Sequence, residues 1–214
     1  MHNGPSPYDL VVSLGKNCQP AYQIRRYTGV QRAQVFDWCM TPDSALTQVI
    51  RHGFSGWFDP DQLIPHSDGA YKHRESGVVF LHEFNSFPDF ASGYAASAPR
   101  IEQLIFRWLD LVTSDKNVLF VRIHAEEPHV PSTAADLVRS LVETSSLGFD
   151  LLYLVSPEIF DPTWQVEGVT FRPHRRHGPD QDWRGHNADW DAYFAEMGIP
   201  KQPDLALGNA AKAV

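Results

Sequence analysis

Cys18 is the residue of this chain whose type and position best suit covalent chemistry. It follows a short apolar run and a glycine turn, and Pro20 then begins a segment compatible with an amphipathic helix that ends at Gly29. The first turn of a helix presents unpaired N–H groups and the positive end of the helix dipole, which stabilise a thiolate and a developing oxyanion. Cys18 is therefore a candidate nucleophile, although a free cysteine is also commonly a small core residue.

His82 is the histidine that we pair with Cys18 as its general base. It lies near the carboxyl end of an apolar segment, residues 78–84, that predicts a strand. In this pairing the imidazole takes the thiol proton, the thiolate attacks a carbonyl, and an acyl-enzyme passes its acyl group to water or an amine. The alternative for His82 is a satisfied histidine of the core or of a loop.

Asp37 is the third catalytic candidate. Residues 34–38 form a short apolar segment that ends in an acid and an indole, and we interpret this segment as a strand end that carries the carboxylate toward the site. A structural role is an open alternative, in which Asp37 caps the following helix or pairs with Arg122.

Four further side chains are predicted to contact the substrate. Asn17 and Gln19 flank the cysteine, and either amide would complete an oxyanion site that the backbone N–H of Cys18 begins. A local turn hydrogen bond is an equally good interpretation of Asn17. The other two predicted contacts are Trp38 and Arg122.

Strand and helix patterns alternate along the chain and predict an α/β fold with a largely parallel central sheet and flanking helices. We expect one layered domain over residues 1–200 and a flexible tail over 201–214. The strongest patterns predict strands at 117–124 and 149–155 and helices at 45–50, 100–112, 133–144 and 191–197. Residues 54–77 are expected to form a long loop or irregular flap, and both this segment and residues 183–190 have the aromatic content of a lid.

The composition narrows the possible partners. The 214 residues carry a formal net charge of −8, which argues against binding to nucleic acid or to an anionic membrane surface. The two cysteines, Cys18 and Cys39, together with the lack of a signal peptide or a spanning apolar run, predict a cytoplasmic protein with two free thiols.

We expect neither a cofactor nor a metal ion. The sequence has no glycine-rich phosphate loop of standard spacing. A late polar stretch has the residue types of zinc ligands but not the spacing of a metalloprotease site, and it comprises His174, His177, Asp180, Asp182 and His186. The nearby Arg172, Arg175 and Arg176 would suit an anion, but a solvated surface is the more ordinary interpretation.

Four short motifs occur in order along the chain: SLGKNC at 13–18, VFDW at 35–38, FLHEF at 80–84 and FVR at 120–122. In these motifs the chain resembles a bacterial family of papain-like cysteine peptidases catalogued as domain of unknown function 1796, over roughly residues 8–155. The resemblance implies a papain-like Cys–His site with Cys18 as nucleophile and His82 as base. The family usually has His-Asp-Phe where this chain has Glu83 after the histidine, and on a regular strand Glu83 would face away from His82.

Two classes of function follow. The first is a cysteine-dependent acyl enzyme, either a hydrolase of amide or thioester bonds or an acyltransferase, that acts on a small-molecule or carrier-linked acyl substrate. The second is a non-catalytic binding or accessory protein that retains the fold in a glycan or natural-product pathway.

Overall fold

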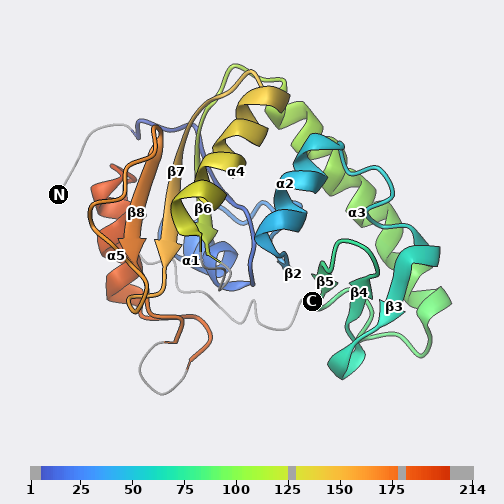
Figure 1. The fold of residues 1–214 in the computed structure, drawn as a ribbon. Coiled ribbons are helices and arrows are strands. Elements are labelled where there is room, and N and C mark those ends of the chain that lie inside the picture. Colours follow the sequence, from blue (N-terminus) through green and yellow to red (C-terminus); the bar gives the residue numbers. More distant parts are fainter. Residues whose placement is uncertain (1–5, 125–128, 178–181, 203–214) are drawn as a thin grey trace.

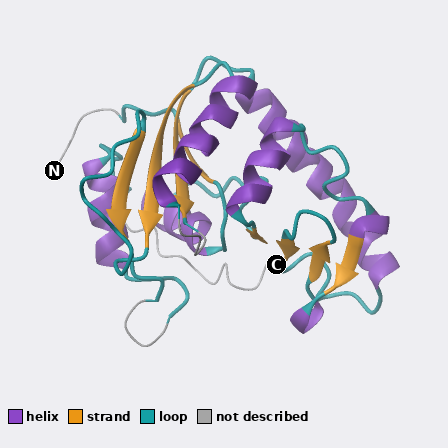
Figure 2. Ribbon diagram, in the orientation of Figure 1, coloured by secondary structure: helices purple, strands orange, loops and turns teal. Residues whose placement is uncertain are grey.

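The computed structural model describes residues 6–124, 129–177 and 182–202 of the chain. It confirms the α/β class and a parallel sheet, but these residues form two four-stranded sheets where we predicted one (Figures 1 and 2). Among the described residues, no helix is long and apolar enough to cross a membrane.

The first sheet is parallel throughout, with the strand order β1-β6-β7-β8. These strands are β1 (Leu10–Ser13), β6 (Asn117–Ile123), β7 (Gly148–Val155) and β8 (Val169–Pro173). Helices cover both of its faces, which explains why β6 and β7 are almost continuously apolar. The predicted strands at 117–124 and 149–155 are thus confirmed.

Each face of this sheet has its own apolar core. On one face Leu119 and Leu152 pack with residues of α1 (Gln19–Thr28) and α5 (Asn187–Glu196). On the other face Phe120 and Tyr153 pack with residues of three helices, α2 (Asp43–Arg51), α3 (Phe90–Val112) and α4 (Val130–Thr144). The alternation of side chains along each strand therefore builds a three-layer arrangement around the parallel sheet.

The second sheet is antiparallel, with the strand order β2-β5-β4-β3. Its strands are β2 (Cys39–Met40), β5 (Val79–Phe80), β4 (Tyr71–His73) and β3 (Leu63–Pro65). The prediction of a long loop at 54–77 is therefore wrong, since β3 and β4 lie within it. The aromatic residues Phe54 and Trp57 of this segment are buried in the core, which removes them as parts of a lid.

Several element boundaries also differ from the sequence prediction. Helix α3 begins at Phe90, where the Asp89 side chain accepts the Ser92 N–H at 2.8 Å, and it continues through Pro99. Residues 35–38 form a turn before β2 rather than a strand end, and β5 ends at Phe80, so that His82 lies in a bend after the strand. Residues 203–214, most of the predicted tail, lie outside the described residues.

Arg122 is fully buried near the carboxyl end of β6, and all three of its guanidinium nitrogens donate to protein partners. Its guanidinium donates to Asp43 Oδ1 at 2.6 and 2.8 Å, to the Leu14 carbonyl at 2.8 Å and to the Thr41 carbonyl at 2.6 Å. Asp43 Oδ2 also lies 3.2 Å from His124 Nδ1. The predictions that Arg122 contacts substrate or pairs with Asp37 are therefore wrong, because the side chain is fully buried and each of its guanidinium nitrogens donates to a structural partner, with Asp43 as the paired carboxylate.

Replacement of Arg122 tests this structural role. Arg122→Ala should lower the free energy of unfolding by about 3–5 kcal/mol, because the buried Asp43 carboxylate would lose its charged partner. Denaturant unfolding measures the change. The exposed Arg139, which pairs with Asp136 on the surface of α4, is the matched control, and Arg139→Ala should change stability little.

The difference between wild type and Arg122→Ala should depend on pH. Burial opposes ionisation of Asp43, but Arg122 and His124 outweigh burial and hold the pKa of that carboxyl below its ordinary range. A carboxyl with a lowered folded-state pKa stabilises the protein at neutral pH and loses this effect as the pH falls through the folded-state pKa. A difference that grew on acidification would contradict this assignment.

Candidate active site

Cys18 is delivered to the start of α1 by a tight turn after β1. Gly15 and Lys16 both have positive φ, 74° and 80°, and the cysteine is the residue that immediately precedes the helix. A Cβ on Gly15 would lie 3.0 Å from the Phe36 carbonyl oxygen, so that only glycine fits without a shift of the backbone. The turn thereby places Cys18 beyond the carboxyl end of β1, the edge at which parallel sheets commonly bind ligands.

The structure brings Cys18 and His82 together. The distance from Cys18 Sγ to His82 Nε2 is 3.5 Å, although the two residues are 64 positions apart in the sequence. His82 comes from the bend that follows β5 of the antiparallel sheet and is exposed, whereas Cys18 is 7% exposed. The pair therefore lies where the carboxyl edge of the parallel sheet meets the second sheet.

The thiol and the imidazole both favour their neutral forms. Burial, with a further contribution from the charge of Asp37, raises the pKa of the Cys18 thiol to about 11, although its own backbone N–H and Arg25 act in the opposite direction. His82 is exposed as a whole residue, but the partial burial of its imidazole lowers its pKa. The start of α1 favours a thiolate, but burial and Asp37 together raise the pKa of Cys18 above its ordinary value. In the neutral pair the thiol donates to Nε2 when the ring proton is on Nδ1.

Asp37 lies close enough to Cys18 to affect it electrostatically, but its hydrogen bonds go elsewhere. The buried carboxylate forms an ion pair with Arg25 and accepts the Gln34 N–H at 2.9 Å. Burial raises the pKa of Asp37 to about 6 against the opposing effect of Arg25. Within the described structure, the partners of Asp37 are thus Arg25 and Gln34 rather than His82. Arg25 is a residue of this site that the sequence pattern did not single out, although its position seven residues after Cys18 places the two on one face of a helix.

Trp38 contacts the imidazole of His82. The two ring centroids are 6.0 Å apart and the planes are inclined by 77°, an edge arrangement. The Arg25 guanidinium lies over the Trp38 ring, 4.8 Å from its centroid. Trp38 is half-buried, and its predicted contact with substrate stays a prediction.

The two amide residues beside Cys18 have structural partners. Asn17 Oδ1 accepts the Gln19 N–H at 3.0 Å, which is the local turn hydrogen bond that we left open. Gln19 is fully buried and donates both amide hydrogens to backbone carbonyls, of Arg176 at 2.8 Å and of Trp183 at 2.6 Å. The prediction that Gln19 is an oxyanion donor is therefore wrong, because its two hydrogens are committed.

The acceptor atom of Gln19 is also used. Gln19 Oε1 lies 2.7 Å from Nε2 of the buried His174, which must be the donor in this pair. Burial lowers the pKa of His174 to about 4, so that its imidazole is neutral near pH 7. Gly185 passes so close to Gln19 that a Cβ at position 185 would lie 2.8 Å from Gln19 Nε2.

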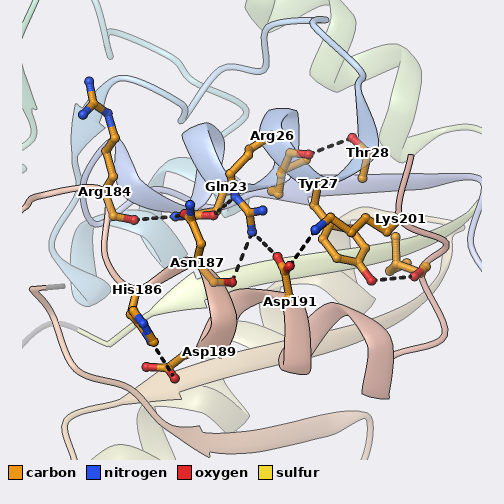
Figure 3. A network of polar contacts seen from close by, with 12 residues as sticks. Gln23, Arg26, Tyr27, Thr28, Arg184, His186, Asn187, Asp189, Asp191 and Lys201 are labelled. Carbon is orange, nitrogen blue, oxygen red and sulfur yellow. Dashed lines mark hydrogen bonds and ion pairs between the residues drawn. The ribbon is translucent and has the colours of Figure 1, made fainter. Parts of the chain in front are cut away.

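Residues 182–191 are fixed along α1 by a second set of polar contacts (Figure 3). Gln23 Nε2 donates to the Arg184 carbonyl at 2.6 Å and to Asn187 Oδ1 at 3.0 Å, and Arg26 forms an ion pair with Asp191. Trp183 in this segment is 46% exposed, and its ring centroid lies 5.5 Å from that of Tyr22 on α1. Gln19 and Gln23, one helical turn apart, thus attach the late tryptophan segment to the helix that Cys18 begins.

Two other predicted features have no part in the Cys–His pair. Glu83 is buried in an ion pair with Arg100, and it lies in the bend after β5 rather than on a regular strand. In the ranges that the structure describes, no group of three or more metal-ligating side chains is present, and Asp180 of the late polar stretch lies outside those ranges.

The fold and this site define an α/β protein whose cysteine and histidine meet at the carboxyl edge of a parallel sheet. Residues 9–156 match the family model described as "Putative papain-like cysteine peptidase (DUF1796)". The match covers more than half of the chain, and the chain belongs to this family. Neither a curated protein nor a solved structure matches it. The family match ends before β8 and α5, so that every partner of the Gln19 side chain lies beyond it.

The electrostatic effect of Asp37 on the thiol is testable by a neutral replacement. Asp37→Asn should lower the pKa of Cys18 below its value of about 11, because it removes a nearby negative charge and leaves Arg25 in place. The thiolate absorbance in the ultraviolet, followed across pH in a Cys39→Ala background, measures it. Glu83→Gln neutralises another buried carboxylate, one with no resolved effect on Cys18, and should leave that pKa unchanged. An unchanged or higher Cys18 pKa in Asp37→Asn would contradict the assignment.

Loss of the Gln19 side chain should release the segment that it holds. Gln19→Ala leaves two carbonyls and His174 without their partner, at a cost of about 1–3 kcal/mol for each buried group that stays unsatisfied. We expect faster amide hydrogen exchange in residues 174–177 and 182–187, measured by mass spectrometry. The exposed Gln48 of α2 is the control. Equal exchange in Gln19→Ala and Gln48→Ala would rule out this role of Gln19.

Proposed function

We propose that this protein is a cysteine-dependent acyl enzyme, in which Cys18 is the nucleophile and His82 is the general base. The observation that carries the proposal is the 3.5 Å distance between Cys18 Sγ and His82 Nε2. Membership of a family described as papain-like cysteine peptidases supports cysteine-based catalysis. The reaction is hydrolysis of an amide or thioester, or transfer of the acyl group to an acceptor.

The neutral pair sets the order of events. As Sγ forms its bond to the substrate carbonyl carbon, the thiol proton moves to Nε2 and the carbonyl π electrons move to oxygen. The oxyanion then re-forms the carbonyl and expels the leaving group, which takes the proton from the imidazolium. Water or an amine attacks the acyl-enzyme in the same manner and regenerates the thiol.

Acyl thioesters on a small molecule or a carrier are the substrates that we favour. Exchange of an acyl group between two thiols conserves the type of bond, and a thiol is a much better leaving group than an amine. A thiolate can leave without taking a proton, so its departure does not depend on a strongly acidic imidazolium. A thioester therefore demands less of a site in which burial disfavours the free Cys18 thiolate.

The second candidate function is a non-catalytic binding or accessory role. The raised pKa and low exposure of Cys18 are the observations that favour it, since a structural cysteine is typically buried and protonated. In that case the contact between Cys18 and His82 would serve packing alone.

Trapping of the acyl-enzyme separates these functions. Wild-type protein incubated with a panel of acyl thioesters and amino-acid amides should gain the mass of one acyl group, and the adduct should map to Cys18. Cys18→Ala should form none, Cys39→Ala should behave as wild type, and His82→Ala should slow acylation by about 10²–10⁴-fold. Acylation that persists in Cys18→Ala, or its complete absence from the wild type, would favour the binding role.

A further inference from the structure

The contact between Trp38 and His82 has a consequence for the proposed reaction, and the inference below rests on that proposed function. A general base must be held in one orientation, and an acidic side chain often does this by accepting the second ring N–H. Here the two nearby buried carboxylates are committed to arginines, Asp37 to Arg25 and Glu83 to Arg100. The indole of Trp38 is the group that packs against the imidazole.

Trp38 is itself fixed by the residues next to it. The planar guanidinium of Arg25 lies 4.8 Å from the ring centroid, and Asp37 holds that guanidinium through an ion pair. Asp37 also accepts the Gln34 N–H at 2.9 Å, which stabilises the turn that carries Trp38. Arg25 Nη1 is buried and makes no hydrogen bond to the described residues, while the guanidinium lies within cation–π distance of the Trp38 ring.

These contacts form a closed series that begins and ends at Cys18. Cys18 begins α1, and Arg25 lies on the same helix two turns further along. From Arg25 the series passes to Trp38, from Trp38 to His82, and from His82 back to Cys18. The position of the base relative to the thiol is thus fixed by the helix that carries the thiol.

We propose that Trp38 is a positioning residue, which orients His82 toward Cys18 through its ring contact and is held in turn by the Arg25–Asp37 ion pair. Trp38 then takes the place of the carboxylate that orients the base in other Cys–His enzymes. The charges of Arg25 and Asp37 act on the Cys18 thiol in opposite directions, so that the ion pair as a whole affects the thiol less than either charge would alone.

The test is a double-mutant cycle on the rate at which iodoacetamide alkylates Cys18 at neutral pH, measured by mass spectrometry. His82→Ala comes first and should slow alkylation by about tenfold or more. Trp38→Ala should lose most of the same advantage, and the double variant should be no slower than His82→Ala alone. Trp38→Phe retains a ring and should restore most of the rate.

Two further variants separate position from charge and from general loss of packing. Arg25→Lys keeps the positive charge but lacks the planar group that stacks, and should give an intermediate rate. Trp164 is also half-buried but packs beside β8, so that Trp164→Ala should leave the rate unchanged. If Trp38→Ala does not fold, Trp38→Leu replaces it, since leucine fills space without a ring.

The outcomes distinguish this inference from the proposed function. A slow His82→Ala with Trp38→Ala and Trp38→Leu within about twofold of wild type would overturn the positioning role and leave the Cys–His pair intact. Additive losses in the double variant would overturn it as well. If His82→Ala itself reacts as wild type, the proposed function fails, and the positioning role fails with it.

Discussion

The buried guanidinium of Arg122 holds together the two stretches of chain on which the whole site depends. It binds the carbonyl of Leu14, directly before the turn that delivers Cys18, and the carbonyl of Thr41, shortly after the turn that carries Trp38. Its ion pair with Asp43 fixes the start of α2 at the same point. A buried guanidinium is stable only when its charge and its hydrogen bonds are satisfied. Its backbone partners here are the segment directly before the Cys18 turn and the segment that follows Trp38.

The packing around Cys18 and His82 favours a protonated thiol and a neutral imidazole in the resting site. Cys18 sits at a helix start, an environment that favours a thiolate, yet it is so far buried that the neutral thiol is preferred. His82 is deprotonated for a similar reason. In the proposed acyl transfer, proton transfer from Cys18 to His82 would then accompany attack on the acyl group. Arg25 and Asp37 belong to the same environment, one stabilising and the other destabilising the thiolate.

The sequence predicted the residues with intrinsic chemistry better than those whose role depends on long-range packing. Cys18 and His82 were singled out by residue type and local pattern, and the structure places them in contact. Arg122 and Gln19 were misassigned to the substrate because a polar side chain in a motif carries no sign of whether it is buried. Their partners come from segments 79 to 164 positions away, a separation that local patterns do not encode.

The fold shows the same division. The long strands β6 and β7 can be recognised in the sequence as apolar runs, because both faces of the sheet are covered. The antiparallel sheet was missed because its strands are two or three residues long, too short to show alternation. Arg25 was missed for another reason: it lies on the same helix as Cys18, but its link to the base runs through Trp38, which only tertiary structure reveals.

Cys18 and His82 form a contact of 3.5 Å in which burial favours the neutral thiol and the neutral imidazole. Nitrogen NMR of ring-labelled histidine near pH 7 tests it most directly, with His82→Gln to assign the signal and Cys18→Ala to remove its partner. We expect a neutral His82 with its proton on Nδ1 and an Nε2 shift that changes when the thiol is removed. A His82 signal indifferent to Cys18→Ala would contradict the pairing in solution, and an imidazolium signal at that pH would contradict its neutral state.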